Sequence, residues 1–223
     1  MVHSFEPLPH NHQQCLENFA KYSNGKIVAH QIALSDKNGF ATFFVSSGNP
    51  EGANKEEWDF GNKSSSLYPP DPTFKKAEWL AFNEQIEVKT QTIASFCKEN
   101  AINKIDFIHL DVQGAELDVL KGAGAFLNTV CGIWLEVENV SMYQGQPLKN
   151  EIETFMKRAN FFKAKDMAFD DYGDQLYLNA SFYSRYKWFV VKNIAISRLI
   201  TLYTTIIPLE LRRILKLKQR LSS

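Results

Sequence analysis

The chain has 223 residues, 44% of them hydrophobic, and its 25 basic residues balance 25 acidic ones. This length and composition are typical of one folded domain with a short appendage, and they exclude a disordered chain. The three cysteines are widely spaced, without a CxxC pair: Cys15, Cys97 and Cys131. Such spacing favours neither a disulfide framework nor a zinc site and indicates a reducing compartment. The first residues lack the pattern of a secretory signal, so we expect a cytoplasmic protein.

Charge is unevenly distributed along the chain. Residues 185–223 contain nine Lys and Arg against Glu210 alone, a net charge of +8, whereas residues 1–184 carry −8. This contrast predicts a main domain over residues 1–182 and a basic amphipathic helical tail over residues 183–223.

The tail has two interpretations. Its segment 188–207 is apolar, but Lys192 and Arg198 make a membrane span too costly. Residues 185–221 suit peripheral contact with an anionic membrane. They suit equally well a helix packed on the body or on a second subunit, which would be a homo-oligomer contact.

Hydrophobic periodicity predicts strands alternating with helices along the chain. The predicted strands are 2–5, 26–33, 40–45, 86–90, 105–111, 132–138, 161–167 and 175–181. The predicted helices are 11–25, 93–100, one beginning near Glu116, and 148–160. A turn at 36–39 predicts a hairpin between the second and third strands, and residues 46–84 predict a long loop. We expect an α/β fold class: a doubly wound, mostly parallel sheet with a C-terminal antiparallel pair.

The run 105–123 is the most informative part of the sequence. Its apolar strand ends at Asp111, the chain turns at Gly114, and a helix follows with Glu116 in its first turn. In open α/β sheets, ligands bind outside the carboxyl ends of the strands, so we expect Asp111 to face a ligand. Asp111 or Glu116 could take the proton of a substrate hydroxyl. Alternatively, Glu116 only stabilises the helix dipole and Asp111 is an N-cap-like acceptor.

Carboxylates also follow two other predicted strands. Glu6 comes directly after the first strand and offers paired acceptors to a ribose diol, or it is simply a solvated acid. Glu136, near the end of the strand 132–138, could extend the same acidic rim. Together with Asp111 these residues do not have the spacing of a metal site, so we predict no metal.

The second predicted strand ends in a segment that could pass an adenine ring: Ala33, Leu34, Ser35 and Asp36. Ser35 or Asp36 could bond the adenine nitrogens, although an ordinary strand-to-turn transition explains the segment as well. His109 is two residues before Asp111 on the same strand. Because central strands are covered on both faces, we expect a buried, hydrogen-bonded histidine there rather than a base.

These segments resemble FkbM-type methyltransferases, which are S-adenosylmethionine-dependent enzymes on a Rossmann-like fold that mostly methylate hydroxyl oxygens. The run 105–123, with its core Asp-Val-Gln-Gly-Ala-Glu, carries most of the resemblance. Further matching segments follow the family's order: Phe5-Glu6-Pro7, residues 33–36, Ser65-Ser66-Leu67, residues 135–137 and residues 174–177. The resemblance covers about residues 2–180.

The resemblance implies roles for individual residues. The implied S-adenosylmethionine contacts are Glu6, Ala33, Leu34, Ser35, Asp36 and Asp111, with Glu6 on the ribose, residues 33–36 beside adenine and Asp111 between cofactor and substrate. The residues placed on the substrate side are Ser65, Ser66, Gln113 and Glu136, the two serines belonging to a loop that covers the site. The family usually has a lysine at the position of His109 and an acid at that of Gln113, so the charge of the site differs here.

The implied function is a methyltransferase acting on a hydroxyl of a sugar, glycan or related metabolite. Family members normally begin with a strand and a glycine-rich turn that wraps the methionine part of the cofactor. Because this sequence begins at what corresponds to the second strand, we expect that first strand and helix to be missing from it. The alternative function is therefore a non-catalytic remnant that serves as a structural or partner-binding module.

Two other function classes are disfavoured. A nicotinamide-dependent oxidoreductase needs a glycine-rich GxGxxG loop, and the sequence contains none. Nucleic-acid binding is disfavoured because residues 1–184 are acidic and show no recognition motif.

Overall fold

The computed structural model describes four stretches of the chain: residues 1–22, 25–52, 60–73 and 78–185. The chain divides into two units, Met1–Asn179 and Ala180–Ser223. Only residues 180–185 of the second unit are described, and they are helical. The predicted tail and its membrane or oligomer contacts therefore lie almost wholly outside the described residues. Within the described stretches, no helix has the length and hydrophobicity that a membrane span requires.

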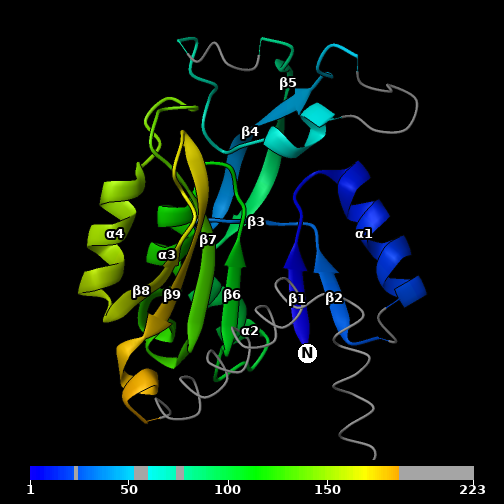
Figure 1. The fold of residues 1–223 in the computed structure, drawn as a ribbon. Helices are drawn as coiled ribbons and strands as arrows, with labels where there is room; N and C mark the ends of the chain where they lie inside the picture. Colours follow the sequence, from blue (N-terminus) through cyan, green and yellow to red (C-terminus); the bar gives the residue numbers. More distant parts are fainter. Residues whose placement is uncertain (23–24, 53–59, 74–77, 186–223) are drawn as a thin grey trace, which may run out of the picture. The chain divides into compact units, whose positions relative to one another are not determined.

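The first unit is an α/β arrangement with three sheets (Figure 1). The first sheet is a parallel pair, β1 (Val2–Phe5) and β2 (Ile27–His30). The second has the order β3-β5-β4, with bounds Ala33–Leu34, Ala81–Gln91 and Gly39–Ser47. The third has the order β6-β7-β9-β8, with bounds Phe107–Leu110, Gly132–Glu138, Tyr172–Asn179 and Phe161–Asp166.

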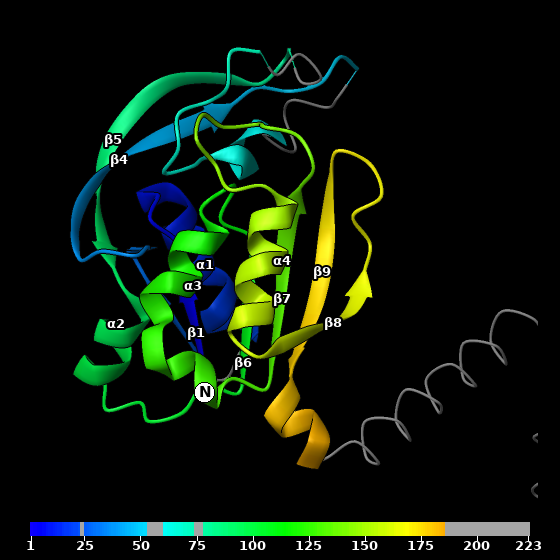
Figure 2. The same cartoon turned by 90° about the vertical axis from the view of Figure 1, so that its left-hand side faces the viewer.

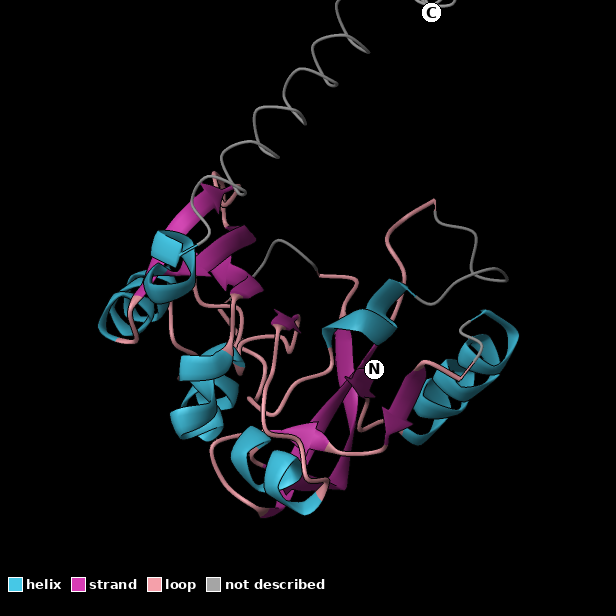
Figure 3. Cartoon of the chain, turned by 90° about the horizontal axis from the view of Figure 1, so that it is seen from below, coloured by secondary structure: helices cyan, strands magenta, loops and turns pink. Residues whose placement is uncertain are grey.

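Four α-helices connect these strands: α1 (Pro9–Tyr22), α2 (Ile93–Glu99), α3 (Glu116–Ala123) and α4 (Lys149–Arg158). Short 3-10 helices cover Phe60–Ser64 and Gly124–Thr129. Seen from below, the helices of this unit lie outside its strands (Figure 3). The predicted alternation of strands and helices is confirmed.

The strand pairing is mixed rather than mostly parallel as predicted. The pairs β1–β2, β3–β5 and β6–β7 are parallel, whereas β4–β5, β7–β9 and β8–β9 are antiparallel. The predicted C-terminal antiparallel pair is confirmed as β8–β9. The predicted hairpin between the second and third strands is wrong. The chain leaves the first sheet after His30, and both β3 and β4 pair with the long strand β5 instead.

The strands β1 and β6 each lie at the edge of a sheet and do not pair with each other. Both views place them near one another (Figures 1 and 2), and in Figure 1 their arrowheads point the same way. Phe5 of β1 packs against the core cluster that contains Ile108 of β6. The carboxyl ends of β1 and β6, followed by Glu6 and Asp111, therefore lie at the same edge of the fold.

The main core lies between the four-stranded sheet and the helices α2, α3 and α4, two of which stand in front of the strands in Figure 2. Ile133, Leu135 and Val137 of β7 are fully buried in it. Because side chains alternate along a strand, Trp134 and Glu136 point to the opposite face. The face of β7 that carries Glu136 is thus not the one the helices cover.

Helix α1 begins at Pro9, two residues before the predicted start at Asn11. Proline suits the first helical position because its missing N–H would have no partner there. The preceding turn is closed by the Leu8 N–H, which donates to Glu6 Oε1 at 2.8 Å. The Asn11 side chain does not cap the helix and bonds Asn62 instead.

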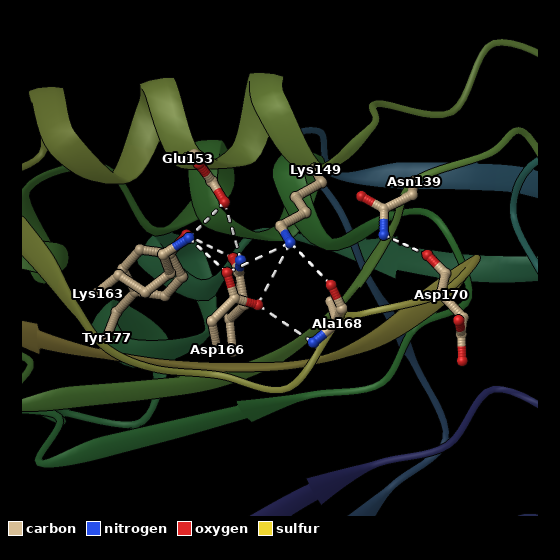
Figure 4. Close-up of polar contacts among 9 residues, drawn as sticks. Asn139, Lys149, Glu153, Lys163, Asp166, Ala168, Asp170 and Tyr177 are labelled. Carbon is tan, nitrogen blue, oxygen red and sulfur yellow. Dashed lines mark hydrogen bonds and ion pairs between the residues drawn. The ribbon is translucent and has the colours of Figure 1, made fainter.

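A network of opposite charges joins α4 to β8 (Figure 4). Lys163 Nζ lies 2.7 Å from Glu153 Oε1 and 2.6 Å from Asp166 Oδ2. Lys149 Nζ lies 3.3 Å from Asp166 and 3.0 Å from the Ala168 carbonyl oxygen. Burial acts to raise the pKa of Asp166, but hydrogen bonds from the two lysines and neighbouring groups bring it well below the usual range.

Replacing Asp166 by asparagine should lower the free energy of unfolding by about 1 kcal/mol at neutral pH, because this network is only partly shielded from water. A depressed native-state pKa stabilises the fold above the unfolded pKa of about 4 and loses that effect as pH falls further. Urea unfolding at pH 7 and pH 3 measures the difference, which should be smaller at the lower pH because part of the stabilisation is lost below the unfolded pKa. Asp106→Asn, which removes the exposed pair with Lys104, is the control with little effect.

Candidate active site

The candidate active site is built on the sharp turn between β6 and α3. Gln113 and Gly114 both have left-handed backbone conformations, with φ values of 56° and 92°. A Cβ on Gly114 would lie 3.1 Å from the Tyr143 ring and 3.2 Å from Gln146 Cβ, so the turn is packed closely against the loop after β7. A non-glycine residue with positive φ is uncommon, and such strain clusters at functional sites.

Glu116 begins α3, as predicted, but it is completely buried. Its Oε1 accepts a hydrogen bond of 2.9 Å from the Val112 N–H, while Oε2 has no partner in the described part of the chain. Burial, together with the charges of Glu136 and Asp111, raises the pKa of Glu116 to about 7. The bond from Val112 to the buried Glu116 carboxylate stabilises the turn between β6 and α3, so this carboxylate does not face an open site.

Gln113 connects the acidic side chains at this turn. Its Nε2 donates to Asp111 Oδ1 at 2.6 Å and to Glu136 Oε2 at 3.1 Å. Its Oε1 lies 2.9 Å from the Tyr143 hydroxyl, which also lies 2.8 Å from the Ser64 carbonyl oxygen and shares its single proton between the two acceptors. Both ends of the Gln113 amide are therefore fixed, and Asp111 and Glu136 are brought together as predicted.

Two buried residues of this site were missed by the sequence reasoning. Glu138 is 1% exposed, and burial with the charges of Glu116 and Glu136 raises its pKa to about 9. Its position two residues after Glu136 on one strand was a usable signal, because such residues share a face. Tyr143 lies in an irregular loop, and no sequence pattern placed its hydroxyl beside Gln113.

The two loop serines point to different partners. The Ser66 hydroxyl donates to the Gln113 carbonyl oxygen at 2.6 Å and so fixes the loop on the turn after β6. The Ser65 hydroxyl accepts from the Ser46 N–H at 2.9 Å and lies against β4. The structure therefore brings Ser66, but not Ser65, to Gln113.

A second group of predicted residues lies around the ends of β1 and β3. Ala33 packs in a small hydrophobic cluster that includes Leu8, which ties this segment to the one that follows Glu6. The Ser35 N–H donates to the Gln91 carbonyl oxygen at 3.1 Å, so it is already used in the sheet. Asp36 is partly exposed, and the Ser35 hydroxyl lies 3.4 Å from its carboxylate.

Helix α3 packs closely against the segment that contains Ser35 and Asp36. A Cβ on Gly122 would lie 2.1 Å from the Ser35 carbonyl oxygen, so only glycine allows this approach. Tyr68, which follows the two loop serines, also contacts α3, since its hydroxyl donates to Asp118 at 2.7 Å. The α3 helix therefore touches both groups of predicted residues.

The expectation for one of the strand residues, His109, is wrong. His109 is exposed rather than buried, because it lies on an edge strand with its side chain on the face opposite to the core residues Ile108 and Leu110. Of the residues that the structure describes, no three His, Cys, Asp or Glu side chains are arranged to hold a metal ion.

Carboxylates that follow neighbouring parallel strands are typical of α/β proteins that bind a small ligand at the strand ends. The family model described as Methyltransferase FkbM domain matches residues 1–163. The chain belongs to the FkbM methyltransferase family, which confirms the resemblance seen in its sequence.

The chain is also similar to the 2-O-methyltransferase NoeI of Sinorhizobium fredii (strain NBRC 101917 / NGR234). The two are 33% identical over 146 residues, which cover 65% of this chain and 57% of NoeI. The chain thus matches little more than half the length of this curated relative. No solved structure matches it significantly.

Proposed function

We propose that the protein is an S-adenosylmethionine-dependent O-methyltransferase that acts on a hydroxyl of a sugar, glycan or related metabolite. The observation that carries this proposal is the group of carboxylates at the ends of β1, β6 and β7 in a chain of the FkbM methyltransferase family. The 2-O-methyltransferase relative supports a hydroxyl oxygen as the methyl acceptor.

Glu6 and Asp36 fit the nucleoside part of the cofactor. Glu6 uses one oxygen to accept the Leu8 N–H, and a carboxylate has further acceptor sites for a ribose diol. Burial raises the pKa of Glu6, as expected for an acid partly withdrawn from water. The Ala33 side chain faces the hydrophobic cluster, so in this segment Asp36 is the better group for an adenine amino nitrogen.

Asp111, Gln113 and Glu136 fit the acceptor side. Asp111 follows β6 and is exposed to solvent, and Gln113 holds its carboxylate beside that of Glu136. The loop with Ser66 lies on the backbone of the same turn. The acceptor would therefore bind between the strand ends and this loop.

S-adenosylmethionine supplies a methyl group on a positively charged sulfonium. Negative side chains at the strand ends attract that charge and orient the acceptor hydroxyl, so catalysis relies mainly on positioning. The reaction also needs a group that takes the hydroxyl proton. The sequence assigned this step to Asp111 or Glu116, but the complete burial of Glu116 makes it a positioning residue.

Cofactor binding tests the first part of the proposal. Isothermal titration calorimetry should detect saturable binding of S-adenosylmethionine, and Glu6→Gln should weaken it about 10- to 100-fold, the usual effect of a charged hydrogen bond. The matched control is Glu17→Gln, an exposed residue of α1, which should bind like the wild type. Absence of saturable binding to the wild type would contradict the proposal.

Methyl transfer tests the second part. Methyl-labelled S-adenosylmethionine and a panel of methyl glycosides should give labelled methyl ethers. The alternative function, a partner-binding module, draws support from the unpaired neighbouring edges of β1 and β6 among the described strands. A folded protein that gives no labelled ether with any acceptor would favour that alternative.

A further inference from the structure

The four carboxylates near the β6–α3 turn differ in their access to solvent. Glu116 is fully buried and Glu138 is 1% exposed, so neither can touch an acceptor molecule directly. Asp111 is exposed, and water competes with an acceptor for its oxygens. Glu136 is half-buried at the carboxyl end of β7. Of these four, Glu136 alone combines shelter from water with an accessible side chain.

Only one oxygen of Glu136 is engaged. Its Oε2 accepts from Gln113 Nε2 at 3.1 Å, and its Oε1 has no hydrogen-bond partner among the residues that the structure describes. The Gln113 amide cannot rotate freely, because Asp111 and Tyr143 hold its two ends. Gln113 thus orients the Glu136 carboxylate and leaves one oxygen available.

The charges around Glu136 favour its protonated form. The titratable groups that act on it come from every neighbouring element: Asp111 after β6, Asp174 of β9, Glu116 of α3, Glu138 of β7 and Tyr143 of the following loop. His109 lies on the same sheet face, paired with Trp134. In the described part of the chain no Lys or Arg forms an ion pair with Glu136. Burial, with the charges of Asp111 and Asp174, raises its pKa to about 7.

We infer that Glu136 accepts the proton of the acceptor hydroxyl through Oε1 and that Gln113 is its positioning residue. The inference rests on the proposed methyl transfer. In that step the acceptor oxygen bonds to the methyl carbon and the methyl–sulfur bond breaks, leaving its electron pair on sulfur. The hydroxyl proton moves to Glu136 and then to water, which reaches this half-buried side chain. A general base works best when its pKa is near the working pH.

The first test uses the free protein and needs no substrate. In a ¹³C NMR titration of glutamate-labelled protein, the carboxyl signal absent from Glu136→Gln should titrate near pH 7. Asp111→Asn should lower that midpoint, because it removes a like charge. The matched control, Asp106→Asn at the opposite end of β6, should leave it unchanged. Gln113→Ala should raise the midpoint, because a bond to the ionised form is lost. A midpoint near the usual glutamate value would overturn the inference.

The second test uses the transfer reaction. In the wild type, kcat/KM should fall about tenfold per pH unit below about pH 7, as the base becomes protonated. Glu136→Gln should lower kcat about 10²- to 10⁴-fold and abolish this acidic limb. Gln113→Ala should lower kcat more than it changes KM and shift the limb to higher pH. An acidic limb near pH 7 retained in Glu136→Gln would show that another group takes the proton.

The two proposals fail in different ways. If the wild type binds no S-adenosylmethionine and methylates no glycoside, the proposed function fails and the inference fails with it. If methyl transfer occurs while Glu136→Gln keeps wild-type kcat and thermal stability, only the assignment of Glu136 is wrong.

Discussion

Replacing Glu138 by glutamine should make the protein more stable at alkaline pH, by on the order of a few kcal/mol at pH 9. Glu138 is buried, and burial with the charges of Glu116, Glu136 and Asp111 raises its pKa to about 9. Glutamine has the shape of the protonated side chain and never ionises. The variant therefore avoids the cost of ionising a buried side chain.

The sign of this effect follows from proton binding. A raised native-state pKa means that the native protein binds more protons than the unfolded chain between about pH 4 and the native pKa. The wild-type free energy of unfolding should therefore fall as pH rises from about 5 to about 9, and the slope should be smaller in Glu138→Gln. Urea unfolding across this range measures both curves.

The matched control for this prediction is Glu87→Gln, an exposed residue of β5. It removes the same charge without changing a buried site, so its curve should follow that of the wild type. Parallel curves for Glu138→Gln and the wild type would show that Glu138 is as easily ionised in the fold as in the unfolded chain.

Gly122→Ala should destabilise the fold by about 1–3 kcal/mol and weaken S-adenosylmethionine binding. An exposed glycine in a helix usually gains stability when replaced by alanine. Here the new Cβ would lie 2.1 Å from the Ser35 carbonyl oxygen, and a backbone atom cannot move aside as the tip of a side chain can. The clash would push residues 35–36 away from α3, and the proposed adenine contact moves with them.

Urea unfolding and calorimetry measure the two effects of Gly122→Ala. The control is Gly132→Ala in β7, where an added Cβ meets neighbours at an ordinary distance of 3.4 Å. That variant should be close to the wild type in stability and in cofactor affinity. Equal stability of Gly122→Ala and the wild type would contradict the close helix packing described above.

Much of the fold was predictable because its signals are local. The strand 132–138 has the predicted bounds, and the helix predicted over 93–100 is found as α2, where the Thr92 side chain caps its first turn. Each of these depends on a few neighbouring residues. The partner of β4 was not predictable in this way, because it depends on β5, a strand that comes after a long loop.

The candidate site was predictable in part for the same reason. Asp111 and Glu136 were found because Asp111 follows an apolar strand and Glu136 lies near the end of another, and parallel strands bring their ends together. The contact of Gln113 with Tyr143 joins residues 30 positions apart through an irregular loop, so no periodic pattern reveals it. The exposure of His109 follows from an edge position that sequence periodicity does not report.

The hydrogen bonds that hold residues 64–66 in place also hold Gln113. Binding of a molecule under these residues is therefore linked to the protonation of the neighbouring acids. Ser66 bonds the Gln113 carbonyl oxygen, and the Tyr143 hydroxyl lies between the Ser64 carbonyl oxygen and the Gln113 side chain. Lifting residues 64–66 would release both contacts at once and free the amide that orients the strand-end acids. Entry of a molecule beneath the loop would then alter how strongly those acids retain their protons, so occupancy and basicity would change together.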